Sequence, residues 1–157
     1  MPKKSTTGCA RCKKVSPKFY YEPTGTCIYS YPEENLLHVH FGNPTWKKEM
    51  SADEADWAHG VIVRDIYPRY PDKIFFTIMD LSKKEGNEYV SREAMEIYKD
   101  IGSHSQSGPV AQYGKLKSMK EVSKIIMRIA RIKKHLYFVD TLEEAEKKYQ
   151  KWYEKPH

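Results

Sequence analysis

The sequence feature that most constrains the fold is an apolar run from Lys73 to Asp80, which reads KIFFTIMD. Its Ile, Phe and Met residues follow one another without a regular alternation of polar and apolar positions. This pattern predicts a central strand that is covered by helices on both faces. The run ends in Asp80-Leu81-Ser82, and open α/β sheets carry functional residues at such carboxyl ends of their strands.

Strand-like runs before and after this segment predict a mixed sheet. Upstream, residues 27–31 and 36–41 flank a short polar turn and predict an antiparallel hairpin, with an additional short strand possible at 19–22. Downstream, residues 110–113 and 136–139 alternate with helix patterns, as parallel βαβ units do. We therefore expect an α/β fold with a mixed sheet of four to five strands, packed by about four helices.

Capping patterns predict where the helices begin. A hydroxyl residue followed three positions later by Glu, the capping-box pattern, occurs at Ser51/Glu54, Ser118/Glu121 and Thr141/Glu144. A further start, at Ser91, has the capping hydroxyl without the Glu. The helices predicted from these starts span about 52–66, ending before Pro68, then about 92–100, 119–132 and 142–153.

Size and composition predict one folded domain with a short basic extension. The chain has 157 residues, of which 13% are aromatic, and we expect an arm at 1–17 and a single domain at 18–157. The N-terminal basic residues are not followed by an apolar segment, and no apolar run is long enough to cross a bilayer. Three cysteines fit a reducing compartment better than a disulfide framework. These features predict a cytoplasmic protein without a transmembrane segment.

The N-terminal arm contains a possible metal-binding motif. Cys9 and Cys12 have C-x-x-C spacing, and Cys27 with His38 or His40 could supply the remaining ligands of a zinc site. A second C-x-x-C and a spaced histidine pair are both absent from the sequence. We therefore expect no cofactor, with zinc as the alternative, and we expect the two histidines to occupy the solvent face of a half-buried strand.

The sequence favours binding over catalysis. It lacks the G-x-S-x-G nucleophile motif, the H-E-x-x-H metal motif and glycine-rich phosphate loops, so we expect a protein that is not an enzyme. It has no clear nucleic-acid-binding motif either.

The helix expected over about 119–132 has one strongly basic face. Steps of three and four residues place these cations together: Lys117, Lys120, Lys124, Arg128 and Arg131. We interpret this face as the solvated side of a surface helix. The alternative is a binding site for anionic lipid, nucleotide or other phosphate groups, which the net charge of +6 would favour.

Three segments resemble a known family. They are 78–82 (IMDLS), 90–94 (VSREA) and 138–145 (FVDTLEEA), and together with the order of elements over about 27–152 they are similar to the STAS-like domains of sulphate transporters and anti-sigma-factor antagonists. The resemblance is closest to the small stand-alone members. It implies a STAS-like fold and a regulatory module that binds another protein, whose identity the sequence does not give.

The resemblance also implies a regulatory surface. In the antagonists a phosphorylatable Ser begins the helix after the central strand, and Ser91 is the matching position here. The Asp and the Ser-Gly pair of the antagonist motif are missing around it, so a plain helix cap is the alternative. We expect the partner-binding surface or phospho-switch at the carboxyl edge of the sheet, formed by Asp80, Ser82, Ser91 and Arg92.

Overall fold

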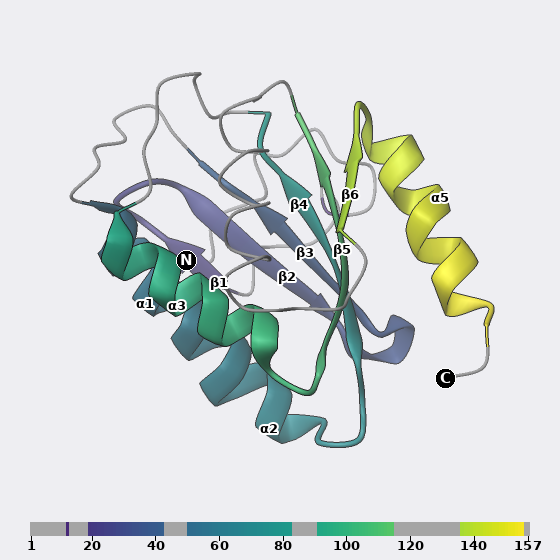
Figure 1. Ribbon diagram of the computed structural model, residues 1–157, viewed down its shortest axis with the longest axis horizontal. Coiled ribbons are helices and arrows are strands. Elements are labelled where there is room, and N and C mark those ends of the chain that lie inside the picture. The colour runs from purple at the N-terminus through teal and green to yellow at the C-terminus, as the bar shows by residue number, and fades with distance from the viewer. Residues whose placement is uncertain (1–11, 13–18, 43–49, 83–90, 115–135, 156–157) are drawn as a thin grey trace.

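The computed structural model describes residues 12, 19–42, 50–82, 91–114 and 136–155, which form a six-stranded mixed sheet with helices on both faces (Figure 1). The strands lie in chain order across the sheet: β1 (Phe19–Tyr21), β2 (Thr26–Tyr31), β3 (Leu36–His40), β4 (Phe75–Asp80), β5 (Ser107–Tyr113) and β6 (Leu136–Val139). The first three are antiparallel, and β3 to β6 are parallel. The α/β class is confirmed, but the prediction of four to five strands was too low.

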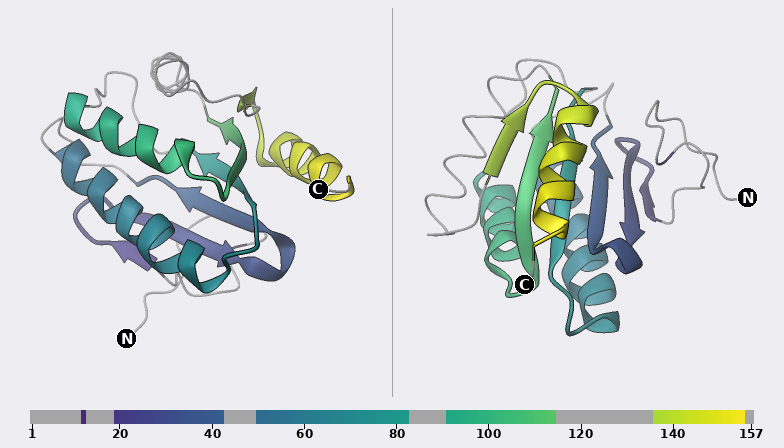
Figure 2. Two further views of the ribbon diagram at one scale, coloured as in Figure 1. Left: turned by 60° about the horizontal axis from the view of Figure 1, so that its bottom comes forward. Right: turned by 90° about the vertical axis from the view of Figure 1, so that its right-hand side faces the viewer.

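The helices of the described residues lie on both faces of the sheet (Figure 2). One face is packed by α1 (Met50–Val61), by a π-helical segment (Ile62–Ile66), by α2 (Tyr67–Arg69) and by α3 (Arg92–Ser103). The other face is packed by α5 (Leu142–Tyr153). Among the described residues, no helix combines the length and apolar character that a bilayer crossing requires.

The central strand has the predicted two-sided burial. Phe75, Phe76 and Ile78 of β4 are all fully buried. Phe75 belongs to the apolar cluster beneath α1, whereas Phe76 and Ile78 belong to the cluster beneath α5. Successive side chains point to opposite faces of a strand, so an uninterrupted apolar run fills both layers of the core.

Two of the predicted helix caps are confirmed. The Ser91 hydroxyl accepts a hydrogen bond from the N–H of Ala94 at 3.1 Å, and the Thr141 hydroxyl accepts one from the N–H of Glu144 at 3.2 Å. Each bond satisfies a backbone donor that the first helical turn leaves without a partner. The predicted start at Ser118 lies outside the described residues.

The first predicted helix differs from the structure at both ends. Ser51 lies inside α1 rather than before it, and its hydroxyl accepts from the N–H of Ser91 instead of capping the helix. At the other end, the helical backbone continues to Arg69 and includes Pro68. In the intervening π segment, the N–H of Tyr67 donates to the carbonyl of Ile62. The backbone hydrogen-bonding pattern therefore changes just before Pro68, which has no N–H to donate.

Candidate functional site

The carboxyl ends of β3 and β4 bring a histidine and an aspartate together. These strands are parallel, and their register pairs His40 with Asp80. Both residues are buried, and Nδ1 of His40 lies 2.7 Å from Oδ2 of Asp80. Asp80 was predicted at this edge from the end of the apolar run, but the strand order and register that bring it to His40 were not predicted.

The second carboxylate oxygen of Asp80 organises the residues that follow the strand. Oδ1 accepts from the backbone N–H of Ser82 at 2.9 Å and from its hydroxyl at 2.6 Å. Burial raises the pKa of Asp80, but the hydrogen bonds from His40 and Ser82 outweigh it and hold the pKa below its ordinary value. Ser82 itself is exposed.

The other two residues of the predicted edge have different surroundings. Ser91 is half-buried, caps α3, and donates its backbone N–H to the hydroxyl of Ser51 at 2.9 Å. Arg92, the first residue of α3, is exposed. The structure therefore brings Asp80 and Ser82 into direct contact, while Ser91 joins the start of α3 to the start of α1.

The two histidines of β3 are buried, and the prediction that they face solvent was wrong. His38 is fully buried and His40 is 5% exposed. They do lie on the face opposite Leu37 and Val39, as predicted, but Cys12 from the N-terminal segment and tyrosines of β2 and β5 pack around them. Only the zinc alternative placed Cys12 near these histidines; the strand pattern favoured solvent, because Cys12 is distant in the chain and belongs to no predicted strand or helix.

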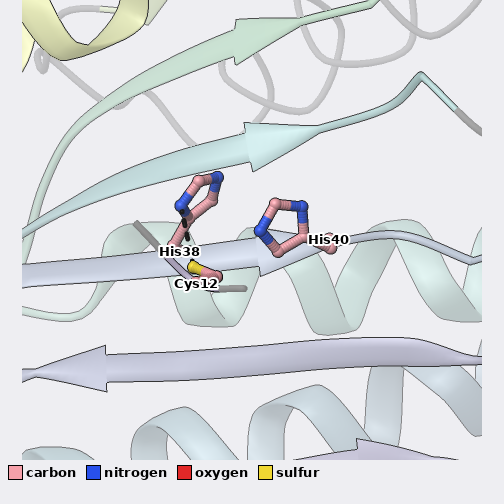
Figure 3. A group of neighbouring side chains, drawn as sticks. All are labelled: Cys12, His38 and His40. Atoms are coloured by element: carbon pink, nitrogen blue, oxygen red, sulfur yellow. Dashed lines mark hydrogen bonds between the residues drawn. The ribbon is translucent and has the colours of Figure 1, made fainter. Parts of the chain in front are cut away.

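Cys12, His38 and His40 form a compact group of potential metal ligands (Figure 3). One ligand atom from each residue lies within 4.8 Å of those of the other two. Sγ of Cys12 is 3.4 Å from Nδ1 of His38, and the two imidazole centroids are 4.0 Å apart. Of the predicted metal candidates, these three are brought together.

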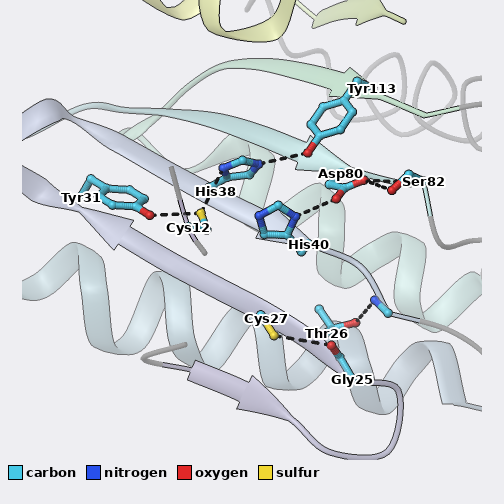
Figure 4. Close-up of polar contacts among 11 residues, drawn as sticks. Cys12, Gly25, Thr26, Cys27, Tyr31, His38, His40, Asp80, Ser82 and Tyr113 are labelled. Carbon is cyan, nitrogen blue, oxygen red and sulfur yellow. Dashed lines mark hydrogen bonds and ion pairs between the residues drawn. The ribbon is translucent and has the colours of Figure 1, made fainter. Parts of the chain in front are cut away.

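Tyrosine hydroxyls from two other strands contact this group (Figure 4). The hydroxyl of Tyr31 is 3.1 Å from Sγ of Cys12, and that of Tyr113 is 3.5 Å from Nε2 of His38. Neither tyrosine was predicted as a site residue, because tyrosines are abundant in this chain and follow no motif.

Of the other predicted metal candidates, Cys27 is described and does not belong to this group. Cys27 is the register partner of His40, but its thiol is directed to the carbonyl of Gly25 at 3.5 Å. Cys9 lies outside the described residues. So does the whole basic face, which comprises Lys117, Lys120, Lys124, Arg128 and Arg131.

Comparisons with known proteins add no assignment to this geometry. No protein-family model matches the chain, and no curated protein or solved structure matches it either. What the site can do is therefore argued from its own residues.

Proposed function

We propose that this chain is a non-catalytic, cytoplasmic regulatory module of STAS-like type, which binds another protein at the carboxyl edge of its parallel strands. The observation that carries the proposal is the contact between Asp80 and Ser82. Both carboxylate oxygens of Asp80 accept hydrogen bonds, one from His40 and two from Ser82. A carboxylate engaged in this way orients a surface residue, whereas a general base needs a lone pair directed at a substrate.

Within the proposed surface, Ser82 is better placed than Ser91 to act as the switch. Ser82 is exposed to a modifying enzyme, and its hydroxyl donates to Asp80 at 2.6 Å. Ser91 is half-buried, and its hydroxyl accepts from Ala94 as a helix cap. The resemblance that pointed to Ser91 thus supports the edge of the sheet more than that particular residue.

Phosphorylation of Ser82 would act on this contact by charge. A phosphoserine brings a charge of about −2 and no hydroxyl hydrogen, so the bond to Asp80 becomes a repulsion between anions. Asp80 lies in the last position of β4 and is hydrogen-bonded to His40, so its position is fixed. We therefore expect Ser82, and not Asp80, to move away from the edge. The proposed result is a change in the surface that a partner contacts.

The test compares protein capture by variants of exposed residues. Wild type, Ser82→Ala, Ser82→Glu, Arg92→Glu and the control Ser105→Glu, which lies in the connection between α3 and β5, serve as baits under matched conditions. We expect a saturable partner that binds wild type, Ser82→Ala and Ser105→Glu, and binds Ser82→Glu and Arg92→Glu at least about tenfold more weakly, as a loss of about 1.4 kcal/mol would give. Equal binding by all five proteins would contradict the proposal.

A further inference from the structure

We propose that Cys12, His38 and His40 bind a divalent transition-metal ion, with zinc as the preferred metal. The three side chains are buried, and one ligand atom of each lies within 4.8 Å of the others. A thiolate and two imidazoles form a donor set that suits zinc and related metals, whereas magnesium and calcium prefer oxygen ligands. This proposal does not rest on the partner-binding function, although Asp80 contributes to both.

The distances are close to those of a tetrahedral site. Zinc bonds of about 2.3 Å to sulfur and about 2.05 Å to nitrogen place these atoms about 3.6 Å apart when the angle is tetrahedral. Sγ of Cys12 and Nδ1 of His38 are 3.4 Å apart. The largest separation in the group, up to 4.8 Å, needs a side-chain adjustment of about 1 Å.

Asp80 determines which nitrogen of His40 is available to the metal. Because Nδ1 is bonded to Oδ2 of Asp80 at 2.7 Å, the ring offers Nε2, which points toward Cys12 and His38 (Figure 4). A carboxylate that accepts from the second nitrogen fixes the tautomer and orientation of a metal-binding histidine and raises its basicity. Asp80 is thus a positioning residue for the proposed site.

The two tyrosines provide the corresponding contacts for the other ligands. With the metal on Nδ1 of His38, Nε2 carries the proton and can donate to the hydroxyl of Tyr113, 3.5 Å away. The hydroxyl of Tyr31, 3.1 Å from Sγ, can donate to the thiolate of Cys12. Each proposed ligand therefore has an outer hydrogen-bond partner, and the fourth coordination position is assigned to water, as in other zinc sites with three protein ligands.

Zinc would join segments that are far apart in the chain. His38 and His40 belong to β3, Cys12 precedes β1, and Asp80 ends β4. A bond from the metal to Cys12 would hold the N-terminal segment against the face of the sheet that α5 covers. Because metal binding of this kind favours the folded state, zinc should also raise the unfolding temperature.

The test measures metal binding by the full chain, without a polyhistidine tag and with its thiols reduced. Bound metal is first removed, and the chain is then reloaded with zinc or titrated with Co²⁺. Mass spectrometry gives the zinc content, and the Co²⁺ titration gives the absorption of a tetrahedral thiolate complex. We expect one ion per wild-type chain. The control Cys27→Ser, which changes a cysteine on the neighbouring strand, should bind as wild type does.

Ligand variants separate this site from adventitious binding. We expect Cys12→Ser to lose the thiolate-to-Co²⁺ absorption. Asp80→Asn, which changes an outer partner, should lower the zinc affinity by roughly 10- to 100-fold, and His38→Gln and His40→Gln should lower it by more. Zinc should raise the unfolding temperature of wild type, Cys27→Ser and Ser82→Ala, but not that of Cys12→Ser, His38→Gln or His40→Gln. Ser82→Ala should retain the metal, which distinguishes the metal site from the carboxyl edge proposed to bind a partner.

Two results would overturn the proposal. One is a wild-type chain that is folded by circular dichroism yet binds no stoichiometric zinc or Co²⁺. The other is binding that Cys12→Ser and His38→Gln leave unchanged, which would place the metal elsewhere.

Discussion

The carboxylate of Glu54, on helix α1, accepts a hydrogen bond from the hydroxyl of Thr26 on strand β2 at 2.9 Å. The same oxygen accepts from the hydroxyl of Thr24 in the β1–β2 turn. Glu54 is fully buried, and both threonines are nearly so. This contact fixes α1 against the N-terminal hairpin through polar atoms within the core.

Replacement of Glu54 should therefore destabilise the fold. Glu54→Ala removes the acceptor of two buried hydroxyls and leaves a void, so we expect a loss of about 2–4 kcal/mol in the free energy of unfolding. Urea denaturation of the variant measures this loss. The exposed neighbour Asp53 provides the control, since Asp53→Ala should change stability by no more than about 0.5 kcal/mol. Similar denaturation midpoints for the two variants would argue against a structural role for the carboxylate.

Gln106 lies between α3 and β5, and its side chain is hydrogen-bonded to α2 and to the segment before β4. We expect the donor group of this side chain to matter more than its size. Its side-chain nitrogen donates to the carbonyls of Tyr67, Tyr70 and Lys73 at 3.2, 2.7 and 3.0 Å. Gln106→Glu has nearly the same shape but places a carboxylate oxygen among three carbonyl oxygens.

We therefore expect Gln106→Glu to cost more stability than Gln106→Ala, for which about 1–3 kcal/mol is typical of lost buried hydrogen bonds. Thermal unfolding at neutral pH gives the comparison. If the two variants unfolded at the same temperature, the donor role of the amide would be refuted. Acidification should narrow the difference between them, because protonation of the introduced carboxyl restores a donor.

Sequence patterns predicted the elements well where local chemistry determines them. Helix α5 has the predicted bounds, because Thr141 caps it, and β4 lies within the predicted apolar run. The prediction of a capping box at Ser51 was wrong, because the side chains of Ser51 and Glu54 form hydrogen bonds with residues that are distant in the chain. The Ser51 hydroxyl binds Ser91, and the Glu54 carboxylate binds the two threonines. A local pattern cannot reveal such distant competition.

The candidate sites were predictable only in part for the same reason. Alternation in β3 correctly placed His38 and His40 on one face, but polarity alone suggested solvent there. Their burial depends on Cys12, 26 positions from His38, and on the register that brings Asp80 to His40. Asp80 was predicted at the edge from the end of the apolar run, whereas its bond to His40 follows from strand order, which the sequence does not state.

Two glycines should respond oppositely to substitution by alanine. A Cβ on Gly42 would lie 2.1 Å from the carbonyl oxygen of Thr24, which is backbone and cannot withdraw without distorting the turn. For a Cβ on Gly60, within α1, the three nearest atoms all belong to the flexible Arg64 side chain, the first at 3.5 Å. Alanine is favoured over glycine in helices by about 1 kcal/mol.

We therefore expect Gly60→Ala to raise the free energy of unfolding by about 0.5–1 kcal/mol, and Gly42→Ala to lower it by about 1–3 kcal/mol. Chemical denaturation of both variants beside wild type tests the pair. Stabilisation by Gly42→Ala, or destabilisation by Gly60→Ala, would be inconsistent with the packing described.

Tyr67 should make stability decline at alkaline pH. Burial raises the pKa of this phenol from its ordinary value to about 12, although a hydrogen bond with Ser107 lowers it in part. Between about pH 10 and about pH 12 the unfolded tyrosine loses its proton while the folded one retains it. The folded state then binds more protons, so the free energy of unfolding falls as pH rises, by up to about 1.4 kcal/mol per unit for this group.

The variant Tyr67→Phe isolates this effect from other alkaline titrations. It removes the phenol while keeping the ring that stacks on Phe75, and we expect its free energy of unfolding to fall less steeply above about pH 10 than that of wild type. Tyr98, whose pKa burial also raises, remains in the variant, so the decline should be reduced rather than abolished. Urea denaturation at a series of pH values gives both slopes. Parallel curves for the two proteins would mean that Tyr67 ionises equally in the folded and unfolded chains, contrary to its burial.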